Sequence, residues 1–593
     1  MMKQFFCIFF LWVGSMSIFH AQVIDTAMLY VDFDPEIGSL QKINTPAEVN
    51  DTVKERVVMT YEIMPGKPDI SFLPSPVSPV KLPADLRQRF YRNFLKVGFG
   101  YPVTPLLALA VHNPDNQKFS VGFNAYHYSS WLSPGKTMKN YALAPFSDTR
   151  AEIFMTRFFK KQTFYSSIGY NHEYALLYGF HRDSLASRLP VGEDVQHYYD
   201  KSYRDSINNA FHHVKLELGL RSNYVLEEKK IKHDTRLNYD MVYNHWHDME
   251  NTIGISGYVG YDARFIKISG SQNYRIDYEV QYYNNRWGDT GTEGKHQIDH
   301  SMKLELRPVI NFTIKEYHLL FGAGIPVVHA MGETHCPVYP VAELQLGLIP
   351  GIMSLYGGVN GYANYNSLQN LLYENPFLKP HLDSARFTRA QINVYAGIKG
   401  NLVKKLNYHL SAHYAFEKDS PFFILDTSNI LHNSFNVMYK NVNVLNATLA
   451  LNWEVLEQLL LNLTANYWYY NFDKITDSLT ETHAWYKPSW EVTFEGQYIL
   501  KKKMIFSVDC HLQFGRWALS PDANNHYLPV KMAPVLDFGA GFEYLFSPRF
   551  SVFARVHNLA FQHYAKYYDF KNAGFNVLAG ITYSFGIDQI KKR

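Results

Sequence analysis

Residues 575–585 alternate between large apolar side chains and small or polar ones. Successive side chains of a β-strand point to opposite faces, so this alternation predicts a strand with one apolar and one polar face. A soluble sandwich and a membrane-spanning barrel both contain such strands. How often the pattern recurs along the chain distinguishes the two folds. The apolar face would carry Phe575, Val577, Ala579, Ile581, Tyr583 and Phe585.

The same alternation recurs in many stretches after residue 93, and the second face of these stretches is often charged. The apolar set Phe494, Phe506, Phe538 and Phe542 is predicted to face lipid, with Cys510 as a small hydrophobe among them. Charged or polar side chains on the second face would line a lumen that binds a solute or holds a luminal segment, or would pair across strands in a wet interior. The candidate lumen-facing residues are Arg275, Asp277, Glu279, Lys303, Glu305, Arg307, Glu491, Glu495, Asp509, His511, Asp537 and Glu543.

About 21 strands can be counted by this pattern, with no helical stretch between them, which is unusual for a soluble domain. A barrel whose two ends lie on the same side of the membrane needs an even number of strands. One further strand is expected either at residues 95–100, followed by a turn at 101–104, or at residues 422–426. The predicted fold is all-β: a transmembrane antiparallel outer-membrane β-barrel of about 22 strands with a short irregular N-terminal segment.

The N-terminus indicates export. Lys3 precedes an apolar run at residues 5–19, and cleavage after Ala21 would remove residues 1–21 as a signal peptide. Residues 22–92 do not show the barrel pattern, and six prolines fall within residues 64–86. Because proline lacks the N–H that a strand ladder needs, this part should be irregular, either a periplasmic linker or a segment inside the lumen. The barrel would occupy residues 93–586, with a basic periplasmic tail at 587–593.

The connections alternate in length. Short turns are expected at residues 500–504 and 547–549, and long loops at 471–489, 516–532 and 558–574. Outer-membrane barrels have short periplasmic turns and long extracellular loops, so both ends of the barrel are placed in the periplasm. Further long loops, at residues 179–206, 362–386 and 419–433, would grip a ligand or another protein, or cover the barrel.

Composition excludes several classes of function. Aromatic residues make up 16% of the chain, which suits interfacial girdles, and the net charge of +3 over 593 residues gives no support for nucleic-acid binding. The sequence contains no G-x-S-x-G motif, no H-E-x-x-H motif and no phosphate-cradling loop, which are signatures of common enzyme classes. Asp509 and Glu491 could form an acid–base pair, but carboxylates are expected in a lumen anyway. His245 and His247 could bind a metal as a pair, but the sequence indicates no third ligand, so no metal is assigned. No catalytic residue or cofactor is assigned either, and the chain is predicted not to be an enzyme.

Two stretches near the C-terminus resemble the last strands of TonB-dependent outer-membrane receptors: residues 553–568, FARVHNLAFQHYAKYY, and residues 572–585, NAGFNVLAGITYSF. The resemblance covers only the barrel portion. The family carries a plug domain of well over one hundred residues before the barrel, whereas only residues 22–92 are expected here. Residues 23–31, VIDTAMLYV, faintly resemble the motif that engages the energising partner.

The resemblance implies uptake or passage of a solute across the outer membrane, with outer-membrane lipid as surroundings and a TonB-type energising protein as partner. The alternative is a non-transporting barrel that serves as a subunit or scaffold of an outer-membrane complex with other outer-membrane proteins or lipoproteins. The shortened N-terminal segment favours that alternative. The sequence does not identify a ligand.

Overall fold

The computed structural model describes residues 91–587 except 114–117, 132–144, 181, 191, 200–202, 204–205, 224–229, 268–269, 289–296, 383–384, 404, 473–482, 522–526 and 573. The predicted signal peptide, the proline-rich residues 64–86, the stretch at 23–31 and residues 588–593 of the basic tail lie outside these residues.

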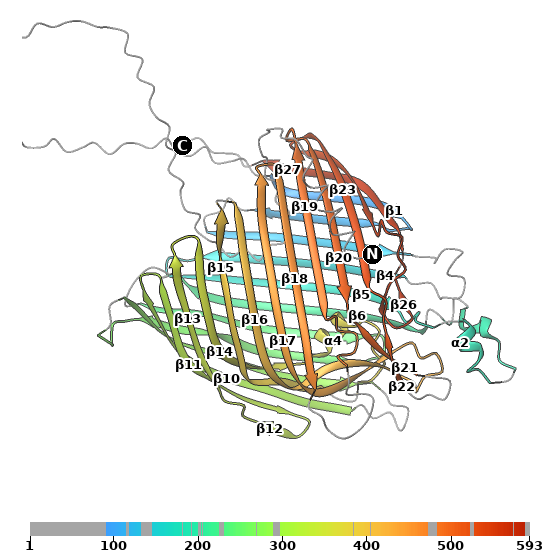
Figure 1. Ribbon diagram of the computed structural model, residues 1–593, viewed down its shortest axis with the longest axis horizontal. Coiled ribbons are helices and arrows are strands. Elements are labelled where there is room, and N and C mark those ends of the chain that lie inside the picture. Colours follow the sequence, from blue (N-terminus) through green and yellow to red (C-terminus); the bar gives the residue numbers. More distant parts are fainter. Residues whose placement is uncertain are drawn as a thin grey trace, which may run out of the picture. The chain divides into compact units, whose positions relative to one another are not determined.

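Antiparallel strands form one sheet of 23 strands, which closes on itself because β1 pairs with β27 as well as with β2 (Figure 1). Among the described strands, β12 pairs with β11 alone. The closed wall therefore contains 22 strands, and the predicted transmembrane-type β-barrel is confirmed. Closure leaves no strand edge with unpaired backbone groups, which is what a strand sheet needs in order to cross a bilayer.

The first half of the wall consists of β1 (Tyr91–Tyr101), β2 (Leu106–Asn113), β3 (Phe119–Ser130), β4 (Phe146–Phe158), β5 (Gln162–Leu176), β6 (Asn208–Ser222), β7 (Ile231–Asn244), β8 (Met249–Asp262), β9 (Ser271–Trp287), β10 (Gln297–Ile314) and β11 (Tyr317–Ala330). The second half consists of β13 (Tyr339–Ile349), β14 (Met353–Tyr365), β15 (Phe387–Val403), β16 (Leu406–Leu425), β17 (Phe435–Leu456), β18 (Leu459–Phe472), β19 (Trp490–Leu500), β20 (Met504–Phe514), β23 (Val535–Ser547), β24 (Phe550–His557) and β27 (Asn576–Ile587). Outside the wall lie β12 (Glu333–His335) and the hairpins β21 (Trp517–Pro521) with β22 (Tyr527–Lys531) and β25 (Ala565–Tyr567) with β26 (Phe570–Lys571).

The strand that the sequence count missed is β1, at the first of the two expected places. The second expectation is wrong, because residues 422–426 do not form a separate strand and residues 422–425 are the end of β16. The expected loop at 419–433 is likewise partly strand, so that the connection between β16 and β17 is residues 426–434. β17 has 22 residues, about twice the 9–11 that a tilted transmembrane strand needs. The wall therefore contains strands longer than a bilayer crossing requires.

The turn lengths follow the predicted alternation. Two-residue turns, 315–316 and 457–458, join β10 to β11 and β17 to β18 at the end of the barrel that carries both chain ends of the wall. At the opposite end, residues 177–207, 366–386 and 515–534 are long connections.

Short helices in the long connections were not predicted. Among the described residues they are α2 (Arg182–Ala186), the 3₁₀ helix η2 (Val195–Tyr199) and α4 (Leu368–Glu374). Ser367 caps α4 by accepting a hydrogen bond from the backbone N–H of Asn370. Within the described ranges, no helix is both long and apolar enough to cross a bilayer.

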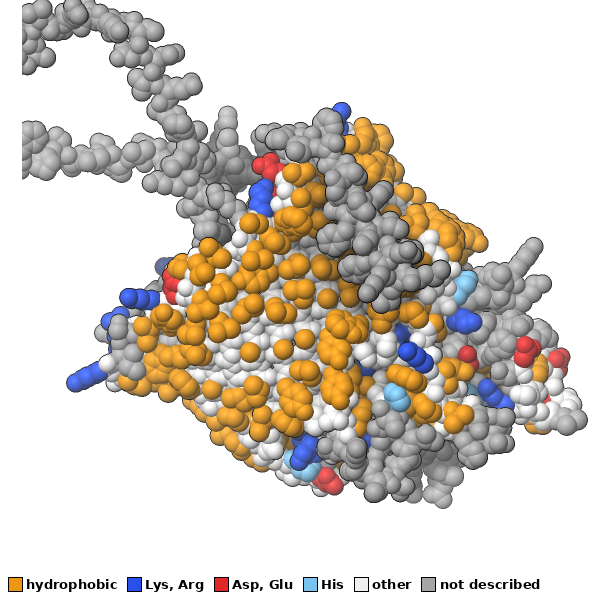
Figure 2. All heavy atoms as spheres, in the orientation of Figure 1, with side chains coloured by type: hydrophobic (Ala, Val, Ile, Leu, Met, Phe, Trp, Pro, Cys, Tyr) orange, Lys and Arg blue, Asp and Glu red, His pale blue; other side chains and the backbone are white. Residues whose placement is uncertain are grey.

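The two faces of the wall differ in chemistry. Ile153 and Ile168 are 55% and 56% exposed on neighbouring strands, and many large apolar side chains are similarly exposed. Figure 2 shows hydrophobic side chains covering the wall over β15–β20, with charged side chains near its edges. Phe506 is the register partner of Phe542, as Cys510 is of Phe538, so these residues share one face. Such an exposed apolar wall matches the lipid-facing belt of a membrane barrel.

On the opposite face, tyrosine rings lie over glycines of the adjacent strand. Tyr339 covers Gly324, and its hydroxyl donates a hydrogen bond to Glu305, two strands away from β13. Tyr165 covers Gly219 in the same way and donates to Asp234 at 2.8 Å. Because glycine has no side chain, the ring can lie across the adjacent strand, and its hydroxyl can donate a hydrogen bond to a carboxylate on the strand beyond.

Alanine at Gly324 is therefore expected to destabilise the barrel, because its Cβ would lie 2.0 Å from Tyr339 Cζ. Overpacking of this kind typically costs about 1–3 kcal/mol. Gly169→Ala is the matched control, since the nearest atom to its Cβ is 3.9 Å away. Urea unfolding in detergent should separate the two variants; equal midpoints would contradict the assigned packing.

Candidate functional site: the charged face and the loop cap

The charged residues predicted on β9 and β10 form a neutral network. Lys303 Nζ lies 2.8 Å from a Glu279 carboxylate oxygen and 2.9 Å from one of Glu305. Arg307 Nη2 lies 2.9 Å from Asp277 Oδ2. Arg275 Nη2 also donates to Asp277 Oδ2, at 3.0 Å. The structure thus brings together all six of these candidates, three cations with three anions.

The carboxylates of the C-terminal strands are held separately. Asp509 pairs with Arg555 at 3.2 Å, and Glu543 accepts a hydrogen bond from Ser551. Glu491 accepts from Gln513 Nε2 at 3.0 Å and lies 3.6 Å from His511 Nε2. Glu491 and Glu543 thus contact side chains of the adjacent strand, whereas Asp509 reaches past β23 to Arg555 of β24.

Asp537 accepts hydrogen bonds from Tyr564 Oη at 2.7 Å and from the backbone N–H of Asn558 at 3.1 Å. Glu495 is exposed and is the register partner of Asp509. The register partner of Glu491 is instead Gln513. No contact therefore joins Glu491 to Asp509, the two residues that could have formed an acid–base pair.

A tyrosine is the hydrogen-bond partner of one wall histidine: His409 Nε2 lies 2.7 Å from the Tyr356 hydroxyl, across one intervening strand. Within the described ranges, no three His, Cys, Asp or Glu side chains are grouped so that they could hold a metal ion.

An apolar cluster fills the end of the barrel that carries the long connections. Its members come from strands as far apart in the wall as β6 and β17, so the cluster crosses the mouth. We call the connections that form it the loop cap: residues 177–180, 366–386 (with 383–384 not described), 426–434, 483–489, 515–534 (with 522–526 not described) and 558–575 (with 573 not described). Figure 1 shows α4 near the ends of β16 and β17. Buried members of the cluster include Phe211, Val242, Trp287, Leu372, Phe387, Phe435, Trp485, Leu519 and Phe570.

Residues 366–386 are anchored to β8 and its turn. The buried carboxylate of Glu250 accepts the backbone N–H of Leu368, in the first turn of α4, at 2.9 Å. Asp248, also buried, lies 2.8 Å from His381 Nδ1 and accepts the backbone N–H of Gly288 at 2.8 Å. A carboxylate that accepts backbone N–H groups holds a loop by hydrogen bonds that water cannot easily replace when it is buried.

The other connections interlock with each other. Asn433 Nδ2 donates to the carbonyl of Leu177 at 2.6 Å. The hydroxyl of Tyr178 donates to the carbonyl of Lys571 at 2.8 Å, and the hydroxyl of Tyr567 donates to the carbonyl of Glu374 at 2.6 Å. The cap is therefore one packed unit and not a set of independent loops.

Basic side chains strengthen this coupling, and one of them, Arg516, is buried. Arg516 donates to the carbonyls of Lys566 at 3.0 Å and Ala533 at 3.1 Å, and Lys487 pairs with Glu374. Burial lowers the pKa of the Lys566 ammonium, Glu374 opposes this, and Lys487 adds to it. Because Arg516 is buried, its guanidinium depends on these carbonyl partners.

The connections of the cap were all expected as loops, and covering the barrel was one of the roles considered for some of them. Their mutual packing was not predicted, because it depends on residues hundreds of positions apart, such as Asn433 and Leu177. The local signal that could have found α4 is Ser367 followed by apolar residues at 368, 371 and 372.

Comparison with known proteins identifies the fold. No model of a protein family and no curated protein matches the chain. Among solved structures, the siderophore receptor PirA of Acinetobacter baumannii is similar, with a TM-score of 0.62, 11% identity and 83% of this chain aligned to 80% of that one. The FrpB iron transporter of Neisseria meningitidis aligns with a TM-score of 0.60 and 11% identity over 83% of this chain and 81% of its own.

A mutant of the ferric enterobactin receptor PfeA of Pseudomonas aeruginosa aligns with a TM-score of 0.58 and 11% identity, over 83% of this chain and 80% of its own. These structures are of receptors and a transporter. The chain has the 22-strand barrel fold of TonB-dependent outer-membrane receptors, the family that its last strands resemble.

Proposed function

We propose that this chain is an outer-membrane barrel through which a solute is taken up or passes. The observation that carries the proposal is the closed wall of 22 strands with an apolar outer surface and a charged opposite face. A barrel of this width encloses a lumen large enough for a solute or a plug. In this proposal the charged residues found on β9, β10, β19, β20 and β23 line that lumen.

The similar structures suggest which solutes to test first. They are those of a ferric enterobactin receptor, a siderophore receptor and an iron transporter. We therefore propose iron chelates as the first substrate class, with an energising protein of the TonB type engaging residues 23–31. Export by a signal peptide at residues 1–21 belongs to the same proposal. Transport of radiolabelled ferric chelates by cells with and without the gene tests it.

The loop cap favours a second candidate, a non-transporting subunit of an outer-membrane complex. A mouth filled by an apolar cluster that includes Leu372 and Phe435 does not offer an open route. A barrel that only holds partners would have no need to open. The two candidates therefore differ in whether passage increases once the cap is loosened.

Loosening the cap should increase permeability if the barrel conducts. Leu372 on α4 is 1% exposed, so Leu372→Asp places a carboxylate in the cluster without a partner. We expect cells that carry this variant to become sensitive to large antibiotics that the outer membrane normally excludes. The control Leu528→Asp changes a side chain of β22 that is 46% exposed and should leave sensitivity unchanged.

Residues 64–86 complicate the test, because the sequence allows them to fill the lumen. The cap variant is therefore combined with deletion of residues 64–82. If the combined variant folds at normal levels and permeability stays unchanged, the scaffold candidate is favoured.

A further inference from the structure

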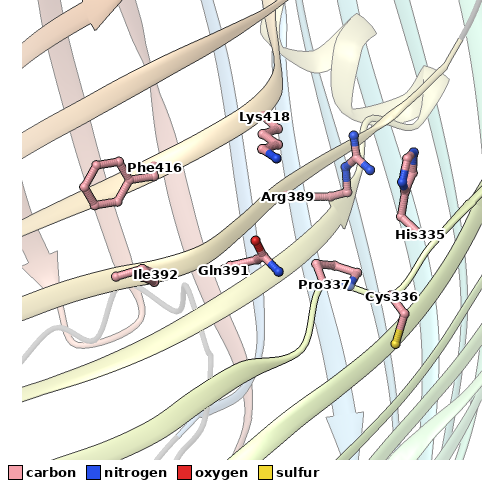
Figure 3. Close-up of a pocket in the computed structure, with 8 residues that line it drawn as sticks. All are labelled: His335, Cys336, Pro337, Arg389, Gln391, Ile392, Phe416 and Lys418. Atoms are coloured by element: carbon pink, nitrogen blue, oxygen red, sulfur yellow. The ribbon is translucent and has the colours of Figure 1, made fainter.

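A pocket of about 260 Å³ opens in the wall where β12 approaches β15 and β16 (Figure 3). His335, at the end of β12, lies on one side of it. Arg389 and Ile392 of β15 and Phe416 and Lys418 of β16 line the other parts. Figure 3 shows Ile392 and Phe416 together at one end, with the three basic side chains toward the other.

The pocket opens on the outer surface of the barrel. Ile392 and Phe416 are 45% and 47% exposed. They continue the exposed apolar faces of Val394 on β15 and Leu410 on β16. Lys418 follows Phe416 by two residues and so projects to the same face, and it is the register partner of Arg389. The surface thus changes from apolar to basic toward the end of the barrel that carries the loop cap.

The basic groups have limited compensation. Asp419 pairs with Arg389 and lies 3.3 Å from Arg386 Nη1, so one carboxylate serves two guanidinium groups. His335 lies 3.2 Å from Glu333. In the part of the chain that the structure describes, Lys418 makes no ion pair, and its side chain is exposed. The pocket therefore has positive charge left over for an anion.

Histidines on the outer face of other strands lie at about the same height along the barrel as the pocket. The rings of His172 and His212 lie 4.6 Å apart on β5 and β6, and His300 Nδ1 lies 2.8 Å from the Tyr282 hydroxyl. His329 Nδ1 lies 2.8 Å from Thr334 of β12, the residue before His335.

In the same strands, the outward residues farther from the cap are exposed and apolar, among them Ile168, Leu304, Leu306, Phe321 and Ile325. A change from aliphatic to amphipathic side chains marks the boundary between hydrocarbon and headgroups. The pocket, which includes His335, therefore lies at headgroup level.

We propose that this pocket binds the phosphate group of a phosphorylated glycolipid in the outer leaflet of the outer membrane. Lys418 and Arg389 would donate to the phosphate oxygens, and Ile392 and Phe416 would contact the first part of an acyl chain. An anion without an acyl chain would use only half of the pocket. The inference rests on the proposed outer-membrane location but not on transport.

The test measures lipid binding to the purified, delipidated protein in detergent by native mass spectrometry, with diphosphorylated lipid A as the probe. Lys418→Gln should weaken binding about fivefold, because one cation near an anionic lipid surface contributes about 1 kcal/mol to the binding free energy. Phe416→Ser should weaken it too, and inorganic phosphate alone should not displace the lipid. Lys405→Gln is the matched control, because Lys405 lies in the turn at the other end of the same two strands, paired with Glu454 at 2.6 Å.

Lys418→Gln is chosen before Arg389→Gln because it leaves the Arg389–Asp419 pair intact and should fold. Heat-modifiable migration on gels verifies folding of each variant. Equal binding by wild type and Lys418→Gln, or displacement by inorganic phosphate, overturns the proposal. A barrel that binds lipid A at this pocket but transports nothing would overturn the proposed function and leave this inference standing.

Discussion

Replacing Lys303 by methionine is expected to lower the free energy of unfolding by about 3 kcal/mol. Lys303 is 6% exposed and lies within 2.9 Å of both Glu279 and Glu305. Methionine keeps much of the side-chain volume but leaves two carboxylates close together without their shared cation. Removing one member of a buried ion pair costs much more than the pair contributes, because the remaining charge stays desolvated. Urea or thermal unfolding of the purified barrel in detergent measures the effect.

Lys215→Met is the control for this prediction. Lys215 also pairs with a carboxylate on its own strand, Glu217, but at 3.6 Å and with its side chain 47% exposed. An exposed pair contributes about 0–1 kcal/mol, so this variant should unfold almost as wild type does. If Lys303→Met were as stable as Lys215→Met, the network on β9 and β10 would not be a buried one.

Arginine in place of Phe542 should reduce the amount of folded barrel in the outer membrane. Phe542 is on the outer face of β23, and its ring lies 5.1 Å from that of Phe506 on β20. A cation on the lipid face near the bilayer midplane costs about 2–4 kcal/mol. Heat-modifiable migration of the protein in outer-membrane fractions gives the folded amount.

Glu495→Gln is the matched change on the opposite face of β19. It removes one of two neighbouring carboxylates, Glu495 and Asp509, and places no charge in lipid. This variant should fold at wild-type levels. Similar behaviour of Phe542→Arg and Glu495→Gln would mean that the two faces of the wall had been assigned the wrong way round.

The wall could be predicted from the sequence because its signal is local. A strand of period two shows both faces within a few residues, and Phe538, Phe542 and Asp537 lie on the faces that the alternation assigned. The parity of the strand number required one further strand, and the structure places it at β1, the first of the two positions that the sequence left open. The end of β16 was misplaced because Ser420 and Pro421 suggest a loop, although this stretch pairs with β17 after an irregularity in register.

The cap and the outer pocket could not be predicted in this way. Asp248 and His381 are 133 residues apart, and nothing in either neighbourhood indicates the other. Arg389 and Lys418 become neighbours only through the register of β15 and β16, which follows an irregularity near residue 390. The packing of tyrosine rings over glycines could not be predicted from the sequence either, because it depends on which glycine the strand register places beside each ring.

Single-channel recording in planar lipid bilayers distinguishes a solute-passing barrel that its loop cap closes from a barrel that never conducts. The wild-type barrel should conduct little or nothing, since the loop cap closes its mouth. Stepwise ion conductance is expected for the folded variant that combines Leu372→Asp with deletion of residues 64–82. A folded combined variant that never conducts would contradict a solute-passing barrel, and a wild type that conducts as freely as the variant would contradict closure by the cap.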